Sequence, residues 1–193
     1  MTAYRATTVL PPLVQQAQAL AAQLQFPHSS TVEVGRPLHL LVRHIQRGVI
    51  GEIGTGCGVG AAWIVSALAP QSTFVTVELD PARAGAGRTF FTVFPNVHVL
   101  EGDWHALLAY APFELLFVDG GSAKQYEPDV VLAALAPGGL VVLDDLTPEE
   151  HWPAAWHGRP DPVRTFCLND ERITATEIRV TATSAVILAT VCR

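Results

Sequence analysis

The chain has 193 residues, a length typical of one globular domain. Hydrophobic residues make up 49% and charged residues 16%, so the chain can bury a core, and intrinsic disorder is excluded. The net charge of −6 argues against a nucleic-acid partner, because phosphate binding needs a basic face.

Two helices are predicted before the first strand. The first covers residues 11–25, where apolar side chains recur at helical spacing after two prolines. A polar turn at residues 27–30 separates it from the second helix, which is predicted over Arg36–Arg47 and ends at Gly48.

Short apolar strands then alternate with helices. The predicted strands are Val49–Ile53, Thr73–Glu78, Val97–Leu100, Glu114–Val118 and Leu140–Leu143. The predicted helices between them are Gly60–Ala69, Pro81–Phe94, Trp104–Tyr110 and Glu127–Ala136. This alternation indicates right-handed βαβ units and a buried parallel sheet.

The last part of the chain has a different pattern. Ile173–Val180 and Ala185–Cys192 are rich in Thr, Val and Ile, and a short turn separates them. They predict an antiparallel hairpin that closes the sheet edge. The predicted fold class is therefore α/β and Rossmann-like, a mostly parallel seven-stranded sheet with helices on both faces and a C-terminal hairpin.

A glycine-rich turn follows the first predicted strand, with the sequence Glu-Ile-Gly-Thr-Gly-Cys-Gly at residues 52–58. A dinucleotide site is one interpretation, since Gly56, Gly58 and Ala61 loosely match the G-x-G-x-x-G/A pattern. In the favoured alternative, Glu52 would repel a pyrophosphate but could organise a cationic, amino-acid-like cofactor. The candidate cofactor-binding residues of this segment are Glu52, Gly54, Gly56, Gly58 and Gly60.

Acidic residues stand at the ends of the next strands. Glu78 ends the second strand, where a carboxylate can accept hydrogen bonds from a ribose diol in either class of cofactor site. Asp103 and Trp104 follow the third strand. Asp119 ends the apolar fourth strand, where a carboxylate needs a partner. The fifth strand follows a predicted Leu-Ala-Pro-Gly-Gly turn and ends in two further aspartates.

The order of these motifs over residues 49–145 resembles that of the class I S-adenosylmethionine-dependent methyltransferases. The resemblance implies that the glycine loop holds the methionine part of S-adenosylmethionine. It also implies that Asp103 meets the adenine amino group and that Trp104 packs on the ring. Trp104 as an ordinary core residue is an equal alternative.

Within this class the chain looks closest to the catechol and caffeoyl-CoA type of O-methyltransferase. In that family, aspartates after strands four and five hold a divalent metal, and Asp119, Asp144 and Asp145 match those positions. Oxygen ligands suit Mg²⁺ or Ca²⁺, with Mn²⁺ as another choice. The alternative is that Asp119 binds the cofactor amino group and that the other two aspartates cap a loop.

The general base departs from the family pattern. The family places a lysine three residues after the strand-four aspartate, where this chain has Ser122. Lys124, the only lysine, is the candidate catalytic residue, provided that its pKa is lowered.

The loop that begins at His151 should lie over the active site. Its tryptophans and histidines either clasp a flat aromatic substrate or form a self-packed loop or dimer contact. A metal-independent methyltransferase would use His151 or His157 as its base. An NAD-type oxidoreductase or a non-catalytic binding protein is the alternative from another class.

The chain is predicted to be a single methyltransferase domain over 1–193. Its expected parts are a helical lead-in (1–48), a cofactor-binding core (49–145), and a substrate loop, helix and closing hairpin (146–193). Three scattered cysteines argue against disulfides and structural zinc. With no signal peptide or membrane span evident, we expect a cytoplasmic protein that acts on a small molecule. A homodimer is the expected assembly.

Overall fold

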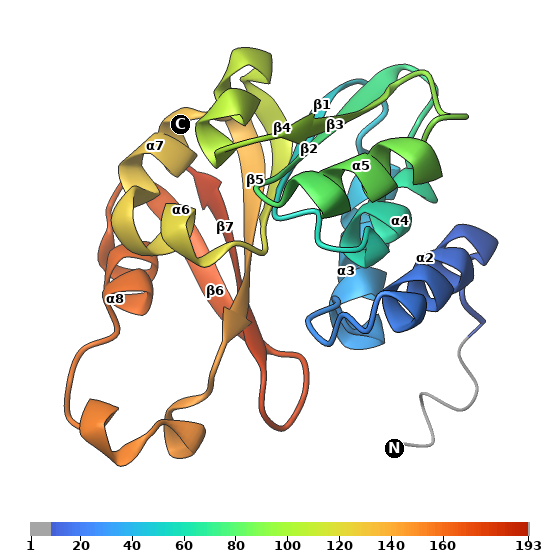
Figure 1. The fold of residues 1–193 in the computed structure, drawn as a ribbon. Coiled ribbons are helices and arrows are strands. Elements are labelled where there is room, and N and C mark those ends of the chain that lie inside the picture. The colour runs from blue at the N-terminus through green and yellow to red at the C-terminus, as the bar shows by residue number, and fades with distance from the viewer. Residues whose placement is uncertain (1–8, 193) are drawn as a thin grey trace.

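A seven-stranded sheet runs through the molecule in the order β3-β2-β1-β4-β5-β7-β6 (Figure 1). The computed structural model describes residues 9–192; residues 1–8 of the expected lead-in lie outside this range. The strands are β1 Gly48–Ile53, β2 Ser72–Glu78, β3 Val97–Glu101, β4 Phe113–Val118, β5 Leu135–Leu146, β6 Ile173–Arg179 and β7 Ala185–Val191. The first five strands are parallel, and β7 runs antiparallel to both of its neighbours. The predicted fold class is confirmed.

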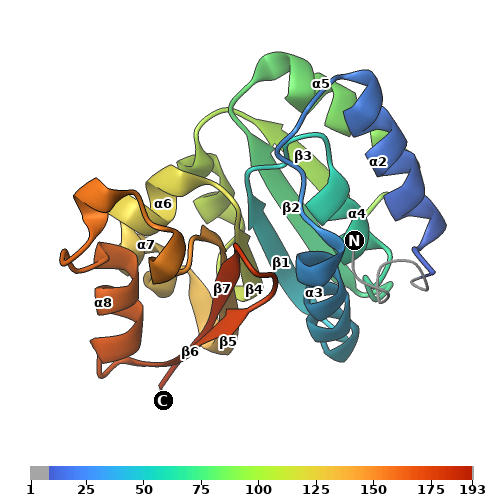
Figure 2. The same ribbon diagram turned by 90° about the horizontal axis from the view of Figure 1, so that it is seen from below.

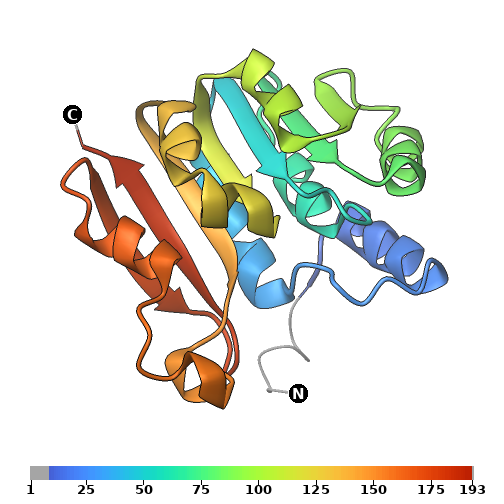
Figure 3. The same cartoon turned by 60° about the vertical axis from the view of Figure 1, so that its left-hand side comes forward.

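Helices cover both faces of the sheet (Figure 2). One face carries α2 Pro12–Gln23, α3 Val32–His44, α4 Val59–Val65 and α5 Pro81–Phe90. The other face carries the 3₁₀ helix η1 Trp104–Tyr110 and the helices α6 Gly121–Tyr126, α7 Pro128–Ala133 and α8 Pro162–Asn169. Two short 3₁₀ turns, η2 Glu149–His151 and η3 Ala154–Trp156, lie in the loop before α8. Figure 3 shows the β6–β7 hairpin and α5 at opposite ends of the molecule.

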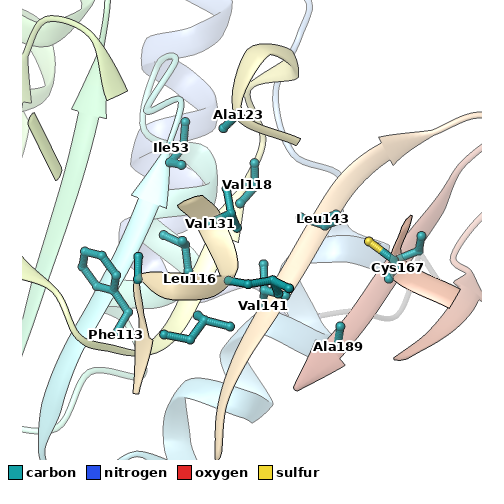
Figure 4. Close-up of a cluster of buried hydrophobic side chains, with 14 of the residues drawn as sticks. Ile53, Phe113, Leu116, Val118, Ala123, Val131, Val141, Leu143, Cys167 and Ala189 are labelled. Atoms are coloured by element: carbon teal, nitrogen blue, oxygen red, sulfur yellow. The ribbon is translucent and has the colours of Figure 1, made fainter. Parts of the chain in front are cut away.

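The core consists of two apolar layers, one on each side of the sheet. Alternate residues of β4 supply both layers, because successive side chains of a strand point to opposite faces. Leu115 and Phe117 pack towards α2, α3 and α4. Leu116 and Val118 pack towards η1, α6, α7 and α8 (Figure 4). Burial on both faces explains why the central strands are almost uninterrupted runs of apolar residues.

Several predicted helix boundaries were wrong. Helix α3 begins at Val32 rather than Arg36, so that Pro37 lies inside the helix and not in its first turn. Helix α5 ends at Phe90 rather than Phe94. The predicted helix at 104–110 has the right bounds but is a 3₁₀ helix.

The connection between β4 and β5 also differs from the prediction. Two short helices, α6 and α7, are found where a single helix was expected over 127–136. Glu127 separates them, and α7 begins at Pro128. The Leu-Ala-Pro-Gly-Gly segment at 135–139 is the first part of β5 and not a turn before it. Pairing between Phe113 and Leu135 holds this segment in the sheet, with a register shift before Leu140. The expected division at residue 145 therefore falls inside β5.

Candidate active site

The glycine loop lies between the end of β1 and the start of α4. Gly54, Gly56 and Gly58 have φ values of 96°, 54° and 81°, a region that side chains other than glycine rarely adopt. The Gly54 and Thr55 N–H groups donate to the carbonyl of Val77 at 3.0 and 3.2 Å. The loop is thus held against the end of β2.

Glu78 fixes the loop from the other side. This buried carboxylate accepts a hydrogen bond from the Gly56 N–H at 2.8 Å through Oε2. Its Oε1 accepts from the Arg83 guanidinium at 2.9 Å, and that guanidinium lies 5.5 Å from the centre of the Phe26 ring. The sequence analysis named Glu78 but missed Arg83 and Phe26.

A cavity of about 330 Å³ opens beside this loop. Of the predicted site residues, it is lined by Gly54, Gly56, Glu78, Asp119, Asp144 and Asp145. The segment from Phe26 to Thr31, between α2 and α3, forms much of the opposite wall. The hydroxyls of Ser29 and Thr31 are buried there without a hydrogen-bond partner in the described part of the chain. The sequence analysis predicted a polar turn at residues 27–30 but did not predict that it lines a cavity.

Glu52, Gly58 and Gly60 do not line the cavity. Glu52 is 1% exposed, and its Oε2 accepts a hydrogen bond of 2.6 Å from the Thr76 hydroxyl. Gly60 lies within α4, where a Cβ atom would come within 2.6 Å of the Glu52 carboxylate. Glu52 and Gly60 thus pack against each other beneath the loop, and direct contact of these three residues with a cofactor stays a prediction.

Asp103 and Trp104 also lie outside the walls of this cavity. Trp104 is 5% exposed and packs in the apolar core, with its ring stacked on His105 at a centroid distance of 4.1 Å. The Asp103 carboxylate accepts hydrogen bonds from the backbone and ring of His105. For Trp104 the structure agrees with the core alternative.

The three predicted metal-binding aspartates come together. Asp119 follows β4, while Asp144 and Asp145 lie near the end of the neighbouring β5, and one oxygen from each lies within 4.8 Å of the others. Burial and the repulsion of Asp144 and Asp145 raise the pKa of Asp119 to about 8. Burial raises the pKa of Asp144 to about 6. Asp145 has a φ of 61°, a backbone conformation that is rare for residues other than glycine.

Lys124 projects from α6 towards the same cluster. The side chain is 6% exposed, and its Nζ donates a hydrogen bond to the Asp144 carbonyl. Burial lowers the pKa of Lys124, although the neighbouring aspartates oppose this effect. A buried lysine whose pKa is lowered gives up its proton more readily than an exposed one, as a general base requires.

A second cavity, of about 450 Å³, adjoins the cluster at Asp145. Asp145 lines both cavities, and Lys124, Trp152 and Trp156 line the second one. The loop that carries the tryptophans is partly self-packed, because the Trp152 indole donates to the Thr147 carbonyl at 2.8 Å. The loop is thus internally hydrogen-bonded, as the self-packed alternative expects, and it also forms a wall of the second cavity.

His151 and His157 line neither cavity. The His151 ring contacts the Ala182 carbonyl at 2.9 Å, and the His157 ring contacts the Trp152 carbonyl at 3.0 Å. Both rings are exposed, so their positions disfavour the metal-independent mechanism with a histidine base.

Comparisons with known proteins agree with this geometry. Residues 52–146 match the methyltransferase domain family. A provisionally named O-methyltransferase of Mycobacterium sp. (strain JLS) is 28% identical over 123 residues, which are 58% of this chain and 55% of the relative. A precorrin-6Y C(5,15)-methyltransferase of Sinorhizobium is 32% identical over 104 residues, 51% of this chain and 24% of that protein. The chain thus spans about half the length of the mycobacterial relative.

Solved structures show the same fold. An O-methyltransferase from Bacillus cereus in complex with SAH has a TM-score of 0.80 at 21% identity, over 97% of this chain and 94% of that one. The O-methyltransferase TomG from Streptomyces achromogenes, in complex with SAM, has a TM-score of 0.76 at 24% identity, over 96% and 92% of the two chains. Together, the family match and the motif order indicate a methyltransferase domain over residues 52–146, and the solved structures agree with it in fold.

Proposed function

We propose that this protein is an S-adenosylmethionine-dependent O-methyltransferase that acts on a small molecule. The observation that carries the proposal is the position of Asp145 and its cluster between two cavities. One cavity is lined by the glycine loop and the other by Lys124 and aromatic side chains. A donor in the first cavity and an acceptor in the second would both reach Asp145, and holding the two reactants close together is how a methyl transfer is accelerated.

In this proposal the methyl donor occupies the cavity beside the glycine loop. Glu78 keeps acceptor capacity for ribose hydroxyls, because a carboxylate offers about four lone-pair sites. The unpartnered Ser29 and Thr31 hydroxyls are available to polar groups of the amino-acid part. The aspartates that line this cavity, in their ionised forms, would attract a cationic sulfonium and repel a pyrophosphate, which supports this donor over a dinucleotide.

The acidic cluster fits a divalent cation. Three carboxylates this close repel one another, and the raised pKa values of Asp119 and Asp144 express that repulsion together with burial. Asp119, Asp144 and Asp145 would hold the metal through oxygen, the donor atom that Mg²⁺ and Ca²⁺ prefer. When bound, the metal would lower the pKa of an acceptor hydroxyl.

Lys124 is proposed as the base. As the acceptor oxygen forms its bond to the methyl carbon, the sulfur–carbon bond of the donor breaks and the hydroxyl proton leaves. A neutral Lys124 amine can take that proton, since its burial lowers the pKa and its Nζ already faces the cluster.

Calorimetry and a transfer assay test the proposal together. We expect S-adenosylhomocysteine to bind in the micromolar range. Methyl transfer to catechol should fall by at least about tenfold with EDTA, or in Asp144→Asn, and magnesium should restore it only in the wild type. His157→Gln, whose ring lies outside both cavities, is the matched control and should keep its activity. Binding of NADH but not of S-adenosylhomocysteine would contradict the proposal.

The homodimer also stays a proposal, and light scattering tests it. In residues 9–192 no helix has the length and apolar character that crossing a membrane requires.

A further inference from the structure

Arg159 is a lining residue of the second cavity with no role in the proposed chemistry so far. It follows the self-packed tryptophan loop, and its side chain is exposed. Among the described residues, no carboxylate forms an ion pair with its guanidinium. A cation in this position is available to a ligand.

The other two basic side chains that line this cavity, Lys124 and Arg164, already have partners within the protein. The Arg164 guanidinium binds Asp161 at 2.6 Å and Glu177 at 2.7 Å. Lys124 faces the acidic cluster. Arg159 is therefore the single lining cation whose charge is not balanced within residues 9–192.

The remaining walls suit a flat ring. Trp152 and Trp156 pack edge to face at a centroid distance of 6.4 Å, and both line the cavity. Trp156 is 54% exposed and Tyr126 is 77% exposed, so both keep aromatic surface free for a partner. Aromatic faces of this kind stack on planar ligands and add to the energy of area burial.

We infer that this cavity selects an aromatic acceptor that carries a carboxylate. The acceptor hydroxyl lies at the Asp145 and Lys124 end, the ring lies against Trp152, Trp156 and Tyr126, and the carboxylate binds Arg159. A single guanidinium balances a single negative charge and matches a carboxylate with two parallel hydrogen bonds. This inference rests on the proposed function for the position of the hydroxyl, but the charge preference concerns binding alone.

A matched ligand pair tests the charge preference. Calorimetry compares 3,4-dihydroxybenzoate with the neutral 3,4-dihydroxybenzamide, with magnesium and S-adenosylhomocysteine present throughout. We expect the wild type to bind the carboxylate about five- to tenfold more tightly, because a charge-assisted hydrogen-bond pair contributes about 1 kcal/mol or more. Arg159→Gln should reduce this preference to less than about twofold, and Arg159→Lys should keep part of it.

Arg47→Gln is the control variant, since Arg47 is a surface residue that bonds to Gln71 and lines neither cavity. It should keep the full preference. Equal affinities for the two ligands in the wild type, or a preference that survives in Arg159→Gln, would overturn the inference. Because calorimetry needs no turnover, a preference for the carboxylate without methyl transfer would count against the proposed function and leave this inference standing.

Discussion

Glu52 is a buried carboxyl whose two oxygens are in different situations. Its Oε2 accepts from Thr76, whereas its Oε1 is buried without a partner in the described part of the chain. Burial raises the pKa of Glu52 well above its ordinary value, the Thr76 hydrogen bond opposes this, and the charges of Asp119 and Glu78 add to it. Glu52 thus links the end of β1 to β2 through its hydrogen bond with Thr76. Ionisation of the buried carboxyl lowers the stability of the folded protein.

Stability of the wild type should therefore fall as the pH rises above 4.5, the ordinary pKa of this carboxyl. A group that binds its proton more tightly in the folded protein gives its full stabilisation below the unfolded pKa. This stabilisation is lost as the pH rises through the folded pKa. Melting temperatures from pH 5 to 8 should fall less steeply for Glu52→Gln than for the wild type. Exposed Glu149→Gln should keep the wild-type slope, and equal slopes for Glu52→Gln would refute this assignment.

At the scale of the element, α4 depends on close packing against the sheet. All seven of its residues are buried, and a Cβ atom at Gly60 would lie 2.6 Å from Glu52, 2.9 Å from Ser30 and 3.1 Å from Phe117. Helix α5 is different, because a Cβ atom at Gly85 would meet its nearest neighbour, the Arg88 guanidinium, at 3.9 Å. The two glycines are thus a matched pair in the same fold.

Alanine at the two positions should have opposite effects. Gly85→Ala should stabilise the protein by up to about 1 kcal/mol, because alanine is the better helix former and has room. Gly60→Ala should destabilise it by about 1–3 kcal/mol, because overpacking outweighs helix propensity. Urea unfolding of both variants measures the difference. A stabilised Gly60→Ala would show that the neighbouring side chains move aside freely.

At the scale of the whole molecule, stability comes from the two apolar layers around the sheet. Leu116 is 1% exposed in the layer beneath α6, α7 and α8, whereas Leu40 on α3 is 61% exposed. The layers also hold β4 and β5 in register, and the ends of these strands carry the acidic cluster. Loss of core volume should therefore affect stability first and the site only through these strands.

Leu116→Ala should lower the free energy of unfolding by about 2–5 kcal/mol, through lost burial and the cavity left behind. The melting temperature should then fall by roughly 4–20 °C for a chain of this size. The exposed Leu40→Ala should change stability by less than about 0.5 kcal/mol. Calorimetric melting of both variants measures this contrast, and similar losses would mean that the layer is not tightly packed.

The sequence by itself determined the parallel strands with their closing hairpin, the glycine loop and the positions of the acidic residues at strand ends. These features follow from local rules, because hydrophobic period, glycine conformation and strand direction are read along the chain. The family resemblance implied that Asp119, Asp144 and Asp145 lie together, and they do so because they stand at the ends of neighbouring parallel strands, which meet at one edge of the sheet.

Only the tertiary structure decided which residues line the two cavities. The wall from Phe26 to Thr31, and the packing of the Arg83 guanidinium on Phe26, depend on contacts between segments far apart in the chain, for which the sequence has no local signal. Packing also buries Glu52, which the sequence had assigned to the cofactor, and Trp104, for which a core position was an equal alternative. A motif fixes where a residue stands along its strand or loop. The packing of neighbouring elements fixes what its side chain reaches, because burial depends on everything that surrounds it.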